Sequence, residues 1–240
     1  MHGVTGTDED GLLLELMMKD KGINTDGLWK SPDRMTTNKI RIISRSQQML
    51  RLDREIATDL ETDAADRFIQ KTIDLFVLQQ PDIVIFEDYN KGVLTAAVIR
   101  SLIAWCRQHG VLMSVDPKRK NFFEYTGVDI FKPNLKEARE ALGFLDNKPT
   151  LENLKTIHHL LHAKLGHHLS FITLSEAGVF YQHDEEAVHL PAFVRNIADV
   201  SGAGDTVIAV ASLVYAATRD ARLMATVANL AGGMVCEEVG

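Results

Sequence analysis

The chain has 240 residues and a formal net charge of −7; 45% of its residues are hydrophobic and 25% are charged. This composition is ordinary for a folded globular protein and excludes a disordered tail or a disulfide-rich mini-protein. The length predicts one large domain, or one domain and about half of a second. A net acidic surface repels a phosphate backbone, which argues against a nucleic-acid partner. Any phosphate-bearing ligand needs a local basic or amide-lined site.

The cysteines and the uncharged segments indicate a cytoplasmic protein. Cys106 and Cys236 are far apart and form no CxxC pair, which suggests a reducing compartment. The first residues show no basic segment followed by an apolar one, so we expect no signal peptide. The longest uncharged runs, Thr206–Thr218 and Leu223–Cys236, fall short of the roughly 18 residues that suggest a membrane span.

The first sixty residues predict one helix and one small hairpin. Apolar residues recur at helical spacing over Asp8–Lys21, and Gly22 is a natural helix stop. Polar and apolar residues alternate over Lys39–Ile43, and Met49–Leu52 can return as the partner strand after a turn over Ser44–Gln48. We expect this hairpin to lie outside the main sheet.

From about residue 60 onward, short apolar strands alternate with helices. This alternation is typical of βαβ units around a buried parallel sheet, which predicts an α/β fold. The predicted helices are Thr62–Leu78, Thr95–His109, Asn134–Leu142, Thr150–Leu165, Asp205–Ala217 and Asp220–Val235, and the predicted strands are Asp82–Phe86, Val111–Val115, Asp129–Phe131, Leu169–Leu174, Val179–Gln182 and Ala187–Leu190.

Ligands of such sheets bind beyond the carboxyl ends of the strands, so the segments that follow the strands are the candidate site. These segments are Glu87–Gly92, Asp116–Lys120, Lys132–Glu137, Ser175–Gly178 and Val200–Asp205.

The segment Ser201–Asp205 is the sharpest feature, because it places glycines before a strongly apolar helix. Backbone amides at a helix N-terminus bind anions, and the helix dipole favours negative charge there. Asp205 falls in the first turn, where a carboxylate can accept a proton from an attacking hydroxyl. An Asp that only complements the dipole behind a Gly-rich turn is an equally favoured alternative. The chain has neither a GxxxxGK[ST] nor a GxGxxG motif.

The segment Lys132–Glu137 opens a helix after a strand. Asn134 as N-cap and Glu137 three residues later match a capping box, which is the favoured interpretation. The functional alternative is a helix N-terminus whose Glu137 holds Mg²⁺, directly or through water.

Two further post-strand segments are weaker candidates. Asp116, Pro117 and Lys118 form a polar turn in the favoured interpretation, and a lysine aimed at a phosphate in the alternative. The segment Glu87–Gly92 mixes carboxylates with a lysine in the same way.

Five clustered histidines favour a solvated face over a metal site. Two of them, His158 and His162, have the i, i+4 spacing of a metal pair, but the chain has no HExxH motif and no obvious third ligand. A GxSxG nucleophile elbow is absent as well. The other three are His159, His167 and His168.

Together these segments resemble the ribokinase-like (PfkB-type) carbohydrate kinases. Asp199–Thr206 is similar to the C-terminal signature of that family, Lys132–Glu137 to its NxxE motif, and Thr173–Gly178 to its nucleotide-contacting strand-turn. The resemblance implies a three-layer α/β/α fold with a mostly parallel central sheet. It also implies a single kinase domain over residues 1–240, with lid strands over 36–53.

Within that family, Gln47–Asp53, Asp88–Gly92 and Val115–Lys118 resemble the heptose-7-phosphate kinases, including the kinase half of the bifunctional ADP-heptose synthesis enzyme. The resemblance implies a phosphotransferase with an alcohol acceptor. It would transfer phosphate from Mg-ATP to the anomeric hydroxyl of heptose 7-phosphate, giving heptose 1,7-bisphosphate for lipopolysaccharide-core precursors.

The resemblance also implies roles for individual residues. Candidates for the sugar phosphate are cationic, because a doubly phosphorylated complex in a net acidic chain needs local positive charge. By role, the residues are Asp205 as general base; Gly202, Ala203 and Gly204 as the anion hole; Asn134, Leu135, Lys136, Glu137, Ser175, Glu176, Gly178 and Asn229 for ATP and Mg²⁺, with Glu137 on the metal; Asp199 and Ser201 for a monovalent cation such as K⁺; and Lys91, Lys118, Arg51 and Asp116 for the substrate.

The sequence departs from the family pattern at both ends. The opening βαβ segment of the family, with its sugar-binding Asp and Gly-Gly-Asn stretch, has no recognisable counterpart, and neither do its closing strands and helix. We therefore expect an incomplete domain. Two alternatives stay open: a catalytically impaired fragment that binds nucleotide or a partner, whose exposed sheet edge can drive homodimer formation or aggregation, and a family member with another sugar or nucleoside substrate.

Overall fold

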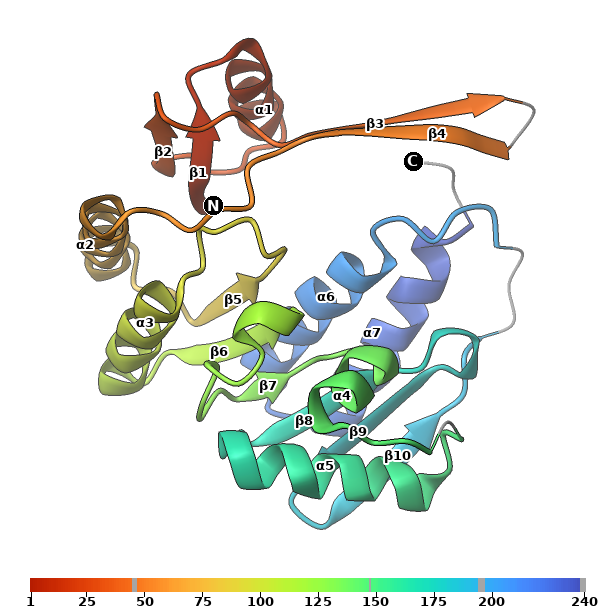
Figure 1. Cartoon of the computed structure of the whole chain (residues 1–240). Coiled ribbons are helices and arrows are strands. Elements are labelled where there is room, and N and C mark those ends of the chain that lie inside the picture. Colours follow the sequence, from red (N-terminus) through yellow and green to blue (C-terminus); the bar gives the residue numbers. More distant parts are fainter. Residues whose placement is uncertain (45–46, 147, 194–196, 238–240) are drawn as a thin grey trace. The chain divides into compact units, whose positions relative to one another are not determined.

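The computed structural model describes residues 1–44, 47–146, 148–193 and 197–237 (Figure 1). The chain divides into two compact units. Unit one comprises Met1–Gln80 and Asn90–Val98, and unit two comprises Pro81–Tyr89 and Ile99–Gly240. The single kinase domain over 1–240 stays a prediction, and each unit is described by itself.

Unit one begins with a β–α–β unit that the sequence patterns do not predict. Strands β1 (His2–Gly6) and β2 (Gly27–Ser31) pair in parallel, with α1 (Glu9–Asp20) between them. This unit carries no Gly-Gly-Asn stretch, so the expected absence of the family's opening segment stays a prediction. Each strand is only five residues long and contains glycine and polar residues, which hides the period-2 pattern of a strand. Helix α1 and its stop match the prediction, and Asp8 caps it by accepting from the Gly11 amide.

The predicted hairpin is confirmed, although residues 45–46 of its turn lie outside the described residues. Strands β3 (Asn38–Ser44) and β4 (Gln47–Arg54) pair antiparallel, with Ile40 opposite Leu52, and form a two-stranded sheet of their own. Helix α2 (Thr62–Gln79) completes this part of unit one and buries its apolar face.

Unit two is built on a six-stranded sheet in the order β10-β9-β8-β7-β6-β5. Strands β5 to β8 are parallel to one another, and β9 pairs antiparallel with both β8 and β10. The mostly parallel sheet of the prediction is thereby confirmed. The strands are β5 (Ile83–Glu87), β6 (Leu112–Asp116), β7 (Ile130–Phe131), β8 (Leu169–Thr173), β9 (Val179–His183) and β10 (Glu186–Leu190).

Helices cover both faces of this sheet, which gives the three predicted layers. Figure 1 shows α4 and α5 on one face and α6 and α7 on the other. Phe171 of β8 packs with α6 and α7, and its neighbour Ser170 points the opposite way and reaches α5, as the period of two in a strand requires. The helices and the short 3₁₀ turns are α3 (Ala96–His109), η1 (Arg119–Asn121), α4 (Leu135–Leu142), α5 (Leu151–Leu165), η2 (Ser175–Ala177), α6 (Ala203–Thr218) and α7 (Ala221–Val235).

Helix α6 starts two residues earlier than the sequence predicts. Gly202 adopts a left-handed conformation with φ of 76° and is the N-cap, so that Ala203 is the first helical residue. Because this conformation is strained for most other residues, the turn needs a glycine here. Asp205 is consequently the third residue of the helix, still within its first turn.

The prediction of a solvated histidine face is wrong for two of the five histidines. His158 and His167 are buried, and a ring nitrogen of each lies within hydrogen-bond distance of Ser170 Oγ, at 2.9 and 2.6 Å. Burial lowers the pKa of His158 to about 4 and that of His167 to about 3, so both are neutral at pH 7. The apolar stripe of α5 faces the sheet, and His158 belongs to that stripe beside Ile157.

No helix in the described part of the chain is long and apolar enough to cross a bilayer.

Removal of the shared hydroxyl should destabilise unit two, because Ser170→Ala leaves two buried imidazoles without their partner. We expect a loss of about 1–3 kcal/mol in the free energy of unfolding. Chemical denaturation at pH 7 measures it, with the exposed Ser44→Ala as a control that should change stability by less than about 0.5 kcal/mol. Equal stability of the two variants would contradict a buried histidine–serine network.

Candidate active site

Three carboxylates meet at the carboxyl ends of the parallel strands in unit two. Glu87 is the last residue of β5, Asp116 is the last residue of β6, and Asp205 lies in the first turn of α6. One carboxylate oxygen from each lies within 4.8 Å of the other two. Strands β5 and β6 are neighbours with Glu87 opposite Asp116, so the register of the sheet brings these two acids together.

Asp88, the residue after β5, determines the side to which the side chains of Glu87 and Tyr89 point. Asp88 is buried, accepts a hydrogen bond from the Tyr125 hydroxyl at 2.8 Å, and donates its own amide to the Asp116 carbonyl at 3.2 Å. Because side chains alternate along extended backbone, Glu87 and Tyr89 point to the side opposite Asp88. The Tyr89 hydroxyl donates to Asp205 Oδ1 at 2.6 Å.

Two lysines neutralise Asp116. Lys132 is only 2% exposed, and its Nζ lies 3.0 Å from Asp116 Oδ2. Lys118 Nζ lies 2.9 Å from Asp116 Oδ1 and 2.9 Å from Glu137 Oε1. Burial disfavours the charged form of Lys118, but the two carboxylates outweigh it and raise the pKa of this lysine. Lys118 therefore belongs to the site, where it is already held by two carboxylates.

Of the three carboxylates, Glu87 is the one whose negative charge is least compensated by neighbouring groups. Its Oε2 is buried and has no hydrogen-bond partner among the described residues. Burial, followed by the negative charges of Asp116 and Asp205, raises the pKa of Glu87 to about 7. Glu87 is therefore partly protonated at neutral pH.

Free amides lie at the N-terminus of α6. The Ala203 amide already donates to the Val200 carbonyl at 3.3 Å, whereas the amides of Gly204 and Asp205 have no acceptor in the described part of the chain. Of the predicted anion hole, Gly202, Ala203 and Gly204, only the Ala203 amide is therefore engaged; the Gly202 amide also has no acceptor among the described residues.

This helix terminus faces the buried ion pair. A Cβ atom added to Gly204 would lie 3.9 Å from both Asp116 Oδ2 and Lys132 Nζ. The free amides and the ammonium of Lys132 therefore border one small region, with the Asp205 carboxylate at its edge. Such an arrangement can hold an anion next to a base.

The capping box at α4 is confirmed. The Asn134 side chain accepts from the Glu137 amide at 2.8 Å, and Glu137 Oε2 accepts from the Asn134 amide at 2.9 Å. Since Oε1 of Glu137 pairs with Lys118, the structural and the site roles of this residue coexist.

The site offers carboxylate oxygens, which are the ligands that Mg²⁺ prefers. Glu87, Asp116 and Asp205 form the group of described residues whose ligand atoms converge, and Glu137 joins them through Lys118. The unpartnered buried oxygen of Glu87 fits a cation at this place.

The residues predicted for a monovalent cation are bonded to each other. Both the amide and the hydroxyl of Ser201 donate to Asp199 Oδ1, each at 2.9 Å. This contact stabilises the turn before α6, and cation binding there stays a prediction.

The residues predicted for the nucleotide lie beyond β8 and along α7. Ser175 and Glu176 are exposed on η2. Gly178 has φ of 92°, and a Cβ there would collide with the Leu190 carbonyl, so only glycine fits. Asn229 donates to the Pro191 carbonyl at 2.9 Å and ties α7 to the segment after β10. These observations give Gly178 and Asn229 structural roles. Contact between the predicted residues and a nucleotide stays a prediction.

Four other predicted residues lie in unit one or at the start of α4. Lys91 and Arg51 belong to unit one, where Lys91 pairs with Glu55 at 2.6 Å and Arg51 pairs with Asp53 at 2.9 Å. At the start of α4, Leu135 is partly buried and Lys136 is exposed.

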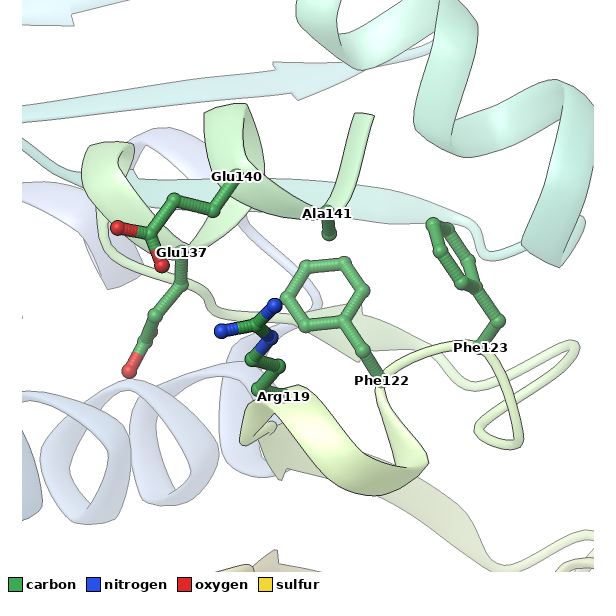
Figure 2. Close-up of a pocket in the computed structure, with 6 residues that line it drawn as sticks. All are labelled: Arg119, Phe122, Phe123, Glu137, Glu140 and Ala141. Carbon is green, nitrogen blue, oxygen red and sulfur yellow. The ribbon is translucent and has the colours of Figure 1, made fainter. Parts of the chain in front are cut away.

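A hollow lies beside Glu137, between η1 and α4 (Figure 2). Figure 2 shows the aromatic rings of Phe122 and Phe123 along it and the Arg119 side chain reaching into it. It borders the site through Glu137 alone. Its lining residues are Arg119, Phe122, Phe123, Glu137, Glu140 and Ala141.

Three residues of the site are not predicted individually from the sequence. In the sequence, Lys132 is only part of a motif, and Glu87 and Tyr89 are only part of a mixed segment. Their position at or just after the ends of apolar strands is the available signal, but their partners lie far away in the sequence, as the separation of 116 between Tyr89 and Asp205 shows.

Glu87→Gln should change how stability depends on pH. The folded protein holds the Glu87 proton up to about pH 7, whereas the unfolded chain releases it near the ordinary value of 4.5, so wild-type stability falls as pH rises between these values. The glutamine variant lacks this loss. Its melting temperature should exceed that of the wild type by a margin that grows as pH rises through this range in Mg²⁺-free buffer. A margin that is constant with pH would contradict a protonated Glu87.

Known proteins resemble this chain along its whole length. Residues 1–240 match the family model described as pfkB family carbohydrate kinase. The bifunctional protein HldE of a Nitratiruptor species is 37% identical over 239 residues, which are 99% of this chain and 49% of that protein. The chain thus spans about half the length of the curated relatives it matches.

Two solved structures share the fold. Phosphofructokinase-2 from Escherichia coli in complex with potassium aligns with a TM-score of 0.81 at 14% identity, over 99% of this chain and 75% of that chain. Arabidopsis thaliana ribokinase complexed with ribose and ATP aligns with a TM-score of 0.77 at 16% identity, over 100% and 76%. Together with the match along all 240 residues, these observations show that the chain belongs to the pfkB family of carbohydrate kinases.

Proposed function

We propose that this chain transfers the γ-phosphoryl group of ATP to the anomeric hydroxyl of heptose 7-phosphate. A phosphotransferase acting on a sugar follows from the family. The observation that carries the chemistry is the Asp205 carboxylate beside the free amides of α6 and the buried ammonium of Lys132. The heptose rests on the 37% identity with the HldE protein.

In the proposed reaction, Asp205 takes the proton of the acceptor hydroxyl. The hydroxyl oxygen forms a bond to the γ-phosphorus, and the bond from that phosphorus to the leaving oxygen of ADP breaks. The amides of Gly204 and Asp205 and the ammonium of Lys132 face the charge on the transferred group. Positioning and electrostatic stabilisation of this kind supply most of the rate in phosphoryl transfer.

The cations and the nucleotide complete the proposal. Glu137, with the nearby Glu87 and Asp116, would hold Mg²⁺, which neutralises the charge of the ATP phosphates. Asp199 and Ser201 would hold K⁺; the potassium complex of the structural neighbour supports this assignment. The nucleotide would lie along Ser175, Glu176, Gly178 and Asn229. We place the enzyme in the cytoplasm, where ATP is available.

A different sugar is the alternative that one observation favours. All three cations proposed for the sugar phosphate are engaged: Lys118 by Asp116 and Glu137, Lys91 by Glu55, and Arg51 by Asp53. An unphosphorylated sugar would leave these ion pairs intact.

Asp205→Asn should lower turnover strongly, with little effect on ATP binding. Loss of a general base lowers kcat by about 10²–10⁴-fold, because the acceptor proton has no destination. ADP release from Mg-ATP and heptose 7-phosphate measures turnover, with Asp184→Asn in the exposed β9–β10 turn as the matched control.

A panel of phosphorylated and free sugars decides the substrate. A wild type that binds ATP but turns over none of them refutes the proposed reaction in favour of nucleotide binding alone.

We also propose that the chain forms a homodimer through the β3–β4 hairpin. One face of this two-stranded sheet is apolar and exposed, with each of its large side chains 45–50% accessible. Burying such a face between two copies removes apolar surface from water. The residues are Ile40, Ile42, Leu50 and Leu52.

Ile42→Lys should convert the dimer into a monomer, because it places a charge in the centre of the apolar face. Light scattering after size exclusion at micromolar concentration measures the mass. Arg41→Gln, on the opposite face of the same strand, should leave the dimer intact. A monomeric wild type at this concentration would refute the dimer.

A further inference from the structure

Tyr89 holds the carboxylate that the proposed reaction uses as its base. Its hydroxyl donates to Asp205 Oδ1 at 2.6 Å, a short hydrogen bond of the kind that charged acceptors form. The face of its ring lies 6.0 Å from Lys118 Nζ, a contact between a cation and an aromatic ring. Tyr89 therefore contacts both a carboxylate and a lysine of the site, although the residue is 47% exposed.

The backbone of Tyr89 is held firmly by its neighbour. Asp88 is buried, accepts from Tyr125, and continues the β5–β6 pairing through its amide. This anchoring leaves the Tyr89 side chain on the Asp205 side of the segment. The hydroxyl thus belongs to a residue two positions beyond the end of β5, directly after the hydrogen-bonded Asp88.

Asp205 needs such a donor because its side chain is exposed. The residue is exposed, and one of its oxygens lies within 4.8 Å of carboxylate oxygens of Glu87 and Asp116. An exposed side chain moves between staggered rotamers, and such a rotation would turn the Asp205 carboxylate away from the cluster. The hydrogen bond from the Tyr89 hydroxyl opposes that rotation.

We propose that Tyr89 is a positioning residue that occupies Oδ1 of Asp205 and so leaves Oδ2 as the oxygen that receives the acceptor proton. This role rests on the proposed function of Asp205. It assigns Tyr89 no contact with the transferred phosphoryl group. Loss of the hydroxyl should therefore reduce the fraction of productive complexes and leave substrate affinity unchanged.

Tyr89→Phe tests the role by separating kcat from KM. We expect kcat for heptose 7-phosphate to fall at least about tenfold, while KM for ATP and for the sugar stays within about twofold of the wild type, since misplacement of a catalytic group costs rate. Tyr181→Phe is the matched control, because the Tyr181 hydroxyl also donates to a carboxylate, Glu186 Oε1 at 2.7 Å. Unchanged kcat in Tyr89→Phe, or an equal fall in both variants, overturns the role.

A second readout does not depend on turnover. The chain has four tyrosines, and protein labelled with ¹³C at the tyrosine ζ carbon gives a Tyr89 resonance that is assigned by its loss in Tyr89→Phe. Asp205→Ala should shift this resonance and leave that of Tyr181 in place. An unmoved Tyr89 resonance overturns the contact. If the resonance shifts but the wild-type protein has no kinase activity, the contact stands, whereas the proposed function and the positioning role that rests on it are refuted.

Discussion

The buried ion pair between Lys132 and Asp116 is the interaction on which the site depends. An ammonium of a residue that is 2% exposed has to be compensated inside the protein, and Asp116 supplies the charge at 3.0 Å. Asp116 also binds Lys118, which in turn binds Glu137 in the capping box of α4. One chain of alternating charges therefore joins the end of β6 to the start of α4, and the N-terminus of α6 lies against it.

The balance of charge explains how an acidic chain can present an anion site. The net charge is −7, and the site itself holds more carboxylates than lysines. Asp116 and Glu137 are neutralised by lysines, however, and Glu87 is partly protonated because burial and like charges raise its pKa to about 7. The remaining attraction for an anion comes from the amides of α6, which carry no titratable group.

Local patterns are sufficient to predict most of the fold, and long-range contacts account for the rest. The alternation of apolar strands and capped helices predicts the sheet of unit two, because each element carries its own signal. Strands β1 and β2 lack that signal, and His158 is buried by packing that its polar side chain does not reveal. Motif spacing likewise finds Asp205 and Glu137, whereas Glu87, Tyr89 and Lys132 become site residues only through partners brought close by folding.

The most direct test of the account is the position of a phosphoryl mimic in a crystal of the protein with Mg²⁺, ADP, aluminium fluoride and heptose 7-phosphate. We expect fluoride atoms within hydrogen-bond distance, about 2.7–3.2 Å, of the Gly204 amide and Lys132 Nζ. We also expect the anomeric oxygen at the same distance from Asp205 Oδ2. A mimic bound elsewhere, with Asp205 remote from the sugar, would contradict it.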